Sequence, residues 1–130
     1  MVSFKSNAKN YRDAESMAAA YLAAYFANSK IKYPLNPFKM LKDEGVEFKI
    51  CNFNKLEGVY IPAQSQEDIS IVGISAKRPI TRQRFTAAHE LCHHFRDADK
   101  QVACPIGKKN ASEYFADAFA SALLMPMGEL

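Results

Sequence analysis

Hydrophobic spacing changes twice along this chain, and the change limits the folds that it can adopt. Apolar side chains recur every three or four positions in residues 7–28, in residues 82–95 and from Asn110 to about Met125, which predicts three long helices. Between the first two, apolar residues alternate with polar ones or form short runs, as they do in strands. We therefore expect an α+β fold with helices beside a small sheet.

Turn and capping residues mark the ends of the helices. Asn36 can cap a short helix that has Pro37 at its first position, and Gly45 can end it. Thr81 can cap the helix of residues 82–95 in the same way. A short helix is therefore expected between the N-terminal helix and the first strand.

Three segments in the middle of the chain predict strands. Residues 46–50 alternate apolar and polar side chains, and residues 58–61 and 69–74 are short apolar runs. We expect a small three-stranded sheet with residues 69–74 at an exposed edge, where an extended peptide could add as a further strand. A loop over residues 97–107 should then lead to the last helix.

The composition fits one soluble domain. Apolar residues make up 48% and charged residues 24% of 130 residues, which allows a core of real size. The net charge of +3 is spread along the chain, so a nucleic-acid-binding domain is the least favoured reading. Three irregularly spaced cysteines argue against a disulfide framework, and no apolar run could span a membrane or serve as a signal peptide. We expect a cytoplasmic protein that does not act at a membrane, while its oligomeric state is open.

Two histidines four residues apart carry the clearest chemical signal. Residues 89–93 read HELCH, and on a helix His89 and His93 share one face, where both imidazoles can bind one metal ion. Zinc suits imidazole and carboxylate ligands, and a catalytic zinc keeps one position for water. Glu90 can reach that water as the general base, which is the HExxH arrangement. The alternative is a pair of helix-surface histidines beside a solvated glutamate.

Glu113, at the start of the last helix, is a candidate for the third ligand. Alone, it would fit a capping box in which Asn110 caps the helix and Glu113 reaches back. An HExxH segment on the preceding helix favours the ligand interpretation. Asp117 follows one helical turn later, where it can accept the second ring proton of a zinc-binding histidine.

The paired motifs resemble the ImmA/IrrE metallopeptidases. The resemblance rests on residues 82–93 (RQRFTAAHELCH) and 113–126 (EYFADAFASALLMP), so it is strong in the second half of the chain and weak in the first. The glutamate followed four residues later by aspartate is also similar to thermolysin-like zinc peptidases. The resemblance implies that Glu113 binds the metal and that Asp117 orients His89. The chain differs from the usual family pattern at Cys92, where glycine is common, and at Phe115, where an acidic residue is common.

The resemblance implies a zinc-dependent endopeptidase with one Zn²⁺ per chain, carried by a zincin-like pair of helices. Its implied substrate is a protein, such as a helix-turn-helix transcriptional repressor of a mobile element or prophage. Family members usually continue with further helices, so we expect residues 1–130 to form a single metallopeptidase domain, truncated at its C-terminus relative to them. The alternative is a metal-containing regulatory binding module that contacts a transcription factor with little or no proteolysis.

A peptidase also needs a donor for the developing oxyanion, and three side chains are of the right type. These are Tyr60, Tyr114 and His94, among which the sequence does not choose. His94 should face away from the line of His89 and His93, as a surface or packing histidine. A structural zinc site that includes Cys92 and Cys104 is disfavoured by their spacing.

Overall fold

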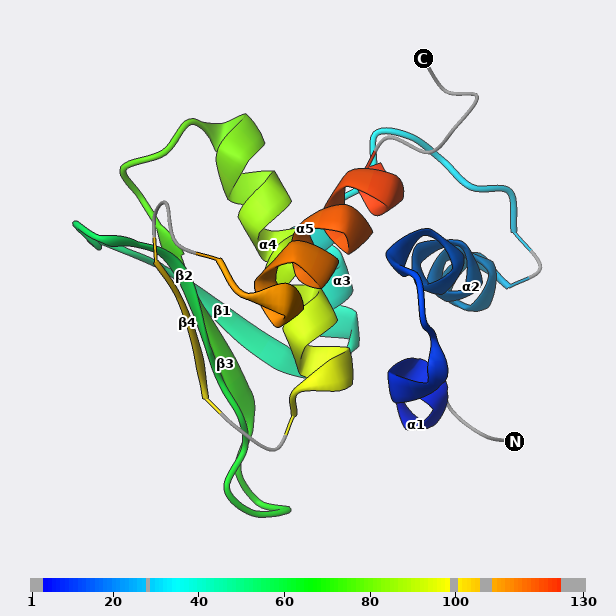
Figure 1. Ribbon diagram of the computed structural model, residues 1–130, viewed down its shortest axis with the longest axis horizontal. Helices are drawn as coiled ribbons and strands as arrows, with labels where there is room; N and C mark the ends of the chain where they lie inside the picture. Colours follow the sequence, from blue (N-terminus) through cyan, green and yellow to red (C-terminus); the bar gives the residue numbers. More distant parts are fainter. Residues whose placement is uncertain (1–3, 28, 99–100, 106–108, 125–130) are drawn as a thin grey trace.

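The fold places all its helices on one side of a four-stranded mixed sheet (Figure 1). The computed structural model describes residues 4–27, 29–98, 101–105 and 109–124. The class is α+β, as expected. The elements in chain order are α1 (Phe4–Asn7), the 3₁₀ helix η1 (Ala8–Asn10), α2 (Ala14–Phe26), α3 (Pro37–Asp43), β1 (Val46–Cys51), β2 (Leu56–Ile61), β3 (Ser70–Ser75), α4 (Ile80–Arg96), β4 (Val102–Pro105) and α5 (Ala111–Leu124).

The sheet has the strand order β1-β3-β2-β4. β1 runs parallel to β3, whereas β2 runs antiparallel to both β3 and β4. Two predictions were therefore wrong: the sheet has four strands, and residues 69–74 do not form an edge. β3 has a neighbouring strand on each side. Its residues are continuously apolar between Ser70 and Ser75, and of these six residues only Ile71 is partly exposed. Such a run is typical of a central strand. β4 lies in the segment expected to be a loop, and four residues are too few to show an alternating pattern.

The N-terminal helix is broken where one continuous helix was predicted. α2 begins at Ala14 because the Asp13 carboxylate accepts a hydrogen bond from the Ser16 amide, at 2.7 Å, and so caps the helix. The Arg96 guanidinium donates to the carbonyl oxygens of Ala8, at 3.3 Å, and Tyr11, at 2.9 Å. The break is thus stabilised by a residue far along the chain. The predicted end at residue 28 lies outside the described residues.

The predicted caps are present in α3 but not in α4. The Asn36 side chain accepts from the amides of Phe38 and Lys39, at 3.1 and 3.2 Å, and Gly45 has a φ of 80°, so the predicted start and end of α3 are confirmed. Thr81 does not cap α4. Pro79 occupies the cap position, with φ −58° and no side-chain cap bond, and Thr81 lies inside the first turn.

We expect Asn36→Ala to lower the free energy of unfolding by about 1 kcal/mol, because two amides at the start of α3 lose their acceptor. Urea denaturation measures the change. Asn36→Asp keeps a cap acceptor and serves as the control. Equal urea midpoints for Asn36→Ala and the wild type would contradict the capping role.

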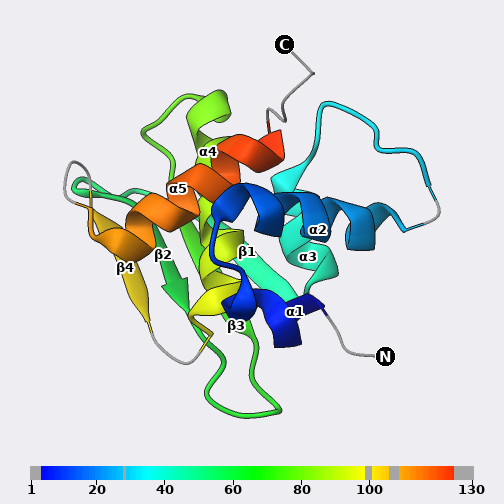
Figure 2. The same ribbon diagram turned by 45° about the vertical axis from the view of Figure 1, so that its right-hand side comes forward.

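α4 occupies the centre of the molecule, between the sheet on one side and α5 and the N-terminal helices on the other (Figures 1 and 2). Every residue from Thr86 to Phe95 is buried, so this part of the helix has no solvated face. The Phe95 ring packs against two other rings, and its centroid lies 4.9 Å from that of Phe4 and 5.0 Å from that of Tyr21. Polar side chains on this stretch of α4 must therefore find partners inside the protein. None of the described helices is both long and apolar enough to cross a membrane.

Candidate metal centre

Three buried side chains from two helices converge on one point. His89 and His93 project from α4 and Glu113 from α5, and each offers a ligand atom within 4.8 Å of the other two. His93 Nε2 lies 3.1 Å from His89 Nε2 and 2.8 Å from Glu113 Oε1, and His89 Nε2 lies 3.3 Å from Glu113 Oε2. The structure thus brings together the three residues that the sequence predicted to meet, although they come from segments 20 and more residues apart.

The geometry and the chemistry of this group fit zinc. Ligand atoms about 2.0–2.2 Å from a tetrahedral zinc lie roughly 3.3 Å from one another. The observed separations of 2.8, 3.1 and 3.3 Å are close to that value, so a small outward shift would admit the ion. Two imidazoles and one carboxylate form a ligand set found at catalytic zinc sites, which leave a fourth position for water or substrate.

Each histidine has a carboxylate behind it. His89 Nδ1 lies 2.8 Å from Asp117 Oδ1, and His93 Nδ1 lies 2.9 Å from Asp97 Oδ2. A proton on Nδ1, donated to the carboxylate, leaves the Nε2 lone pair for a metal. Asp117 was expected in this place. Asp97 was missed because the sequence assigned it to a loop, although its spacing of four residues from His93 was the available signal.

The carboxylates of Asp117 and Asp97 have further partners of their own. Asp117 Oδ2 forms a salt bridge with Lys109, and the Ser112 hydroxyl donates to Asp97 Oδ2 at 3.3 Å. Burial raises the pKa of Asp117, but its bonds to His89 and Lys109 outweigh burial and keep that pKa below its usual value. Asp117 is therefore ionised at neutral pH and can only accept from His89.

The ligand group lies in a field of negative charge. Burial lowers the pKa of His93, yet hydrogen bonds to Asp97 and Glu113 and the charge of Glu90 raise it to about 9. The pKa of His89 is also raised, because Asp117, Glu113 and Glu90 together outweigh burial. Burial raises the pKa of Glu113, but the two histidines hold it well below its usual range. The site thus attracts positive charge, and a metal ion binding at neutral pH must displace protons.

Glu90 is fully buried on α4, between the two histidines in sequence. Its charge raises the pKa of both His89 and His93. It is not one of the three clustered ligand residues, in agreement with a role other than metal binding.

Comparison with known proteins gives the family. The model of the IrrE N-terminal-like domain, Peptidase_M78, matches residues 41–130. The chain belongs to this family. Membership suggests a metallopeptidase-type function, and the matched region contains the sheet, α4 and α5 but not α1 or α2. No curated protein matches the chain.

In this IrrE N-terminal-like domain the three oxyanion candidates lie in different surroundings. The Tyr60 hydroxyl is buried, 2.9 Å from His94 Nδ1 and 3.3 Å from Ser70 Oγ. His94 is 4% exposed, so it is a packing histidine and not a surface one. Tyr114 is 63% exposed, beside Glu113 on α5.

Cys92 is buried on α4, and burial raises the pKa of its thiol well above the usual range, which keeps the sulfur protonated and unreactive. It is not part of the ligand group formed by the described residues. The side chain of Cys104 lies outside the described part of the structure.

Proposed function

We propose that this chain is a zinc-dependent endopeptidase of the HExxH type, with one Zn²⁺ per chain held by His89, His93 and Glu113. The observation that carries the proposal is the convergence of these buried ligand atoms from α4 and α5, next to the Glu90 carboxylate. Family membership supports the peptidase class.

The protein's own residues would divide the work of hydrolysis. A bound zinc ion supplies Lewis-acid activation of water and of the peptide carbonyl. Glu90 accepts the proton of the attacking water and delivers it to the leaving amine nitrogen. Asp117 and Asp97 hold the Nδ1 protons of His89 and His93, so that the Nε2 atom of each ring is the one aimed at the metal. Burial of the group excludes bulk water, which strengthens each of these electrostatic interactions.

We expect Asp117→Asn and Asp97→Asn each to weaken zinc binding about 10–100-fold, because an amide can donate as well as accept and no longer fixes the histidine tautomer. Competition with a calibrated chelator measures the affinity, and circular dichroism checks the fold. Asp68→Asn is the control, because this exposed carboxylate accepts from the amides of Gln64 and Ile69 within the turn between β2 and β3. Wild-type zinc affinity in both variants would show that these carboxylates do not support the site.

The proposed substrate is a protein, in particular a helix-turn-helix repressor encoded beside the peptidase on a mobile element. An extended segment of it would pair with the outer edge of β4, because among the described strands β4 pairs with β2 alone. β4 connects α4 to α5 in the chain.

Peptide hydrolysis that depends on metal tests the proposed function. The purified protein is incubated with a random peptide library, and new termini are identified by mass spectrometry. We expect cleavage that stops after chelation and returns with zinc. Cleavage that is unaffected by removal of the metal would rule out this mechanism.

A regulatory binding module is the second candidate, and the burial of the site favours it. Glu90 and His93 are completely inaccessible and His89 and Glu113 nearly so, which leaves a peptide no direct path to them without movement. If the chain is such a module, the wild type and the Glu90→Gln variant will bind the transcription factor equally well, and neither will cleave it. Isothermal titration calorimetry beside the cleavage assay separates the two functions.

A further inference from the structure

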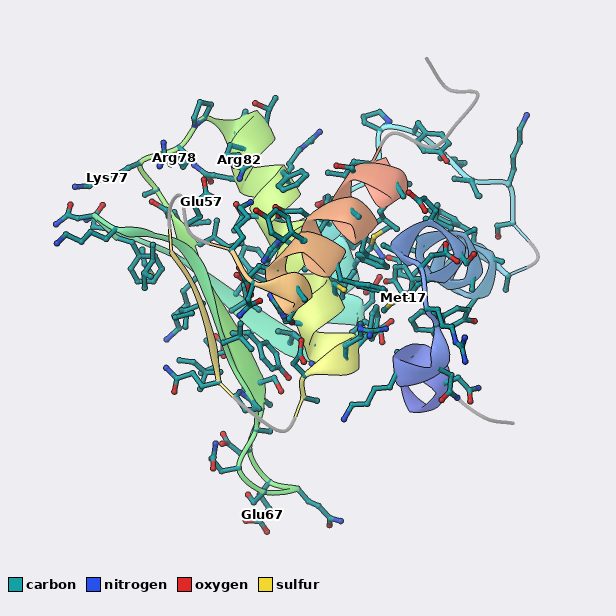
Figure 3. The ribbon with its side chains drawn as sticks, viewed as in Figure 1. Met17, Glu57, Glu67, Lys77, Arg78 and Arg82 are labelled. Carbon is teal, nitrogen blue, oxygen red and sulfur yellow. The ribbon has the colours of Figure 1, made fainter. Side chains whose placement is uncertain are left out.

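β2 lies along one face of α4 and touches it at four successive helical turns. Arg82 Nη2 donates to Glu57 Oε2 at 2.7 Å, and Figure 3 shows these two side chains together with Arg78. At the other end, Tyr60 is bonded to His94. One face of the helix carries residues spaced by four positions, namely Arg82, Thr86, Glu90 and His94.

Gly58 is the residue of β2 that faces the middle of this contact. A glycine inside a strand usually costs stability and often marks a place where another group approaches the backbone closely. The pairing of β2 with β4 is irregular between Leu56 and Gly58, and bulges of this kind often occur next to active sites. Both features point to a requirement at Gly58 other than strand formation.

The requirement is space for the Glu90 carboxylate. A Cβ atom added to Gly58 would lie 2.5 Å from Glu90 Oε2, 2.8 Å from Thr86 Cγ2 and 3.2 Å from the Gly73 carbonyl oxygen. Real Cβ atoms essentially never approach another heavy atom closer than 3.0 Å. With alanine at this position, either the carboxylate moves or α4 moves away from β2.

Glu90 has little room to retreat. It is fully buried, and its neighbours on the helix, from Thr86 to Phe95, are buried as well. The Arg82 bond to Glu57 and the Tyr60 bond to His94 hold helix and strand together on either side of it. The position of the carboxylate is therefore set by the missing side chain of residue 58.

We infer that Gly58 is a positioning residue for Glu90: the absence of a side chain on this strand forms the space in which the carboxylate sits. The consequence for catalysis rests on the proposed function of Glu90 as the base. The contact itself is independent of that function and can be tested without any substrate.

A double-mutant cycle in urea tests the contact. All four proteins carry Thr86→Ser, which removes the competing Cγ2 atom. We expect Gly58→Ala to lower the urea midpoint clearly in this background and to lower it much less when Glu90→Ala is also present. If Gly58→Ala does not fold by itself, recovery of folding by Glu90→Ala is the same positive result. Equal losses with and without the Glu90 carboxylate, or failure to fold in both cases, would overturn the inference.

Gly73→Ala is the matched control. Gly73 is also inside a strand, but its added Cβ would meet Phe53 and Val59 at 3.0 Å, away from Glu90. We expect its loss of stability to be the same in the presence and absence of Glu90→Ala. If Glu90→Ala reduced the loss of stability equally for Gly58→Ala and Gly73→Ala, the effect would be general. That result would overturn a specific contact between Gly58 and Glu90.

A cleavage assay tests whether the contact between Gly58 and Glu90 matters for catalysis. We expect Gly58→Ala to keep its zinc but to cleave library peptides about 100-fold more slowly, since a shift of about 1 Å in a catalytic group can have that effect. Wild-type rates in the folded variant would overturn the positioning role. A wild type that cleaves no peptide would instead disprove the proposed function, and the urea cycle would still decide whether Gly58 accommodates Glu90.

Discussion

Replacing Glu90 with glutamine is expected to reduce peptide hydrolysis about 10²–10⁴-fold while the zinc content stays at the wild-type level. Glutamine has nearly the same shape and fills the same buried space beside Gly58, but it cannot take a proton from water. The loss should fall on kcat, because the proposed base acts only in the chemical step. Peptide cleavage rates and metal analysis on the same preparation measure both quantities.

Glu67→Gln is the matched control for loss of one carboxylate. Figure 3 places Glu67 at the tip of the turn between β2 and β3, away from α4 and α5. This variant should cleave peptides at the wild-type rate. Full activity in Glu90→Gln would remove Glu90 from the mechanism, whereas loss of zinc from it would indicate that the carboxylate contributes to metal binding.

Replacing His93 with alanine is expected to abolish zinc binding and the stability that zinc adds. An ion at 1,000 times its dissociation constant stabilises the folded state by about 4 kcal/mol, which raises Tm by roughly 15 °C in a domain of this size. His93 Nε2 lies within 3.1 Å of both other ligand residues, so its removal leaves only two ligands and a hole between them. Thermal unfolding with and without zinc measures the difference.

The adjacent histidine provides the control. His94→Gln removes an imidazole from the same turn of α4, but His94 bonds to Tyr60 and is not part of the ligand group. This variant will be less stable, yet zinc should still raise its Tm by the wild-type amount. A zinc-induced rise in His93→Ala equal to that of the wild type would show that the metal binds elsewhere.

The candidate metal ligands that share a helix could be predicted because their relation is local. His89 and His93 are one helical turn apart, and so are Glu113 and Asp117, and an α-helix places such residues on one face whatever surrounds them. The prediction that Glu113 meets the two histidines rested on the HExxH segment of the preceding helix and on the resemblance, because spacing within one helix does not show which other helix it contacts. Asp97 obeys the same rule relative to His93, but it ends the helix, and helix ends are the part of a pattern that is least well defined.

The order of the strands and the break in the N-terminal helix could not be predicted. β4 is stabilised by pairing with β2, a contact between residues more than 40 positions apart, and its own four residues show no periodicity. The break after Asn10 is supported by Arg96, which satisfies the carbonyl oxygens of Ala8 and Tyr11. Side-chain hydrogen bonds over such separations depend on how the whole chain packs.

By itself, the sequence determined the class of fold, the caps of α3 and the residue pairs that each helix can offer to a metal, since each of these follows from spacing and capping patterns within short segments of the chain. Only the tertiary structure decided that β3 is central, that Asp97 supports His93 and that Gly58 makes room for Glu90. These features arise where α4 is enclosed by the sheet and α5. Close packing allows one arrangement of atoms across such an interface, and no periodicity along the chain records it.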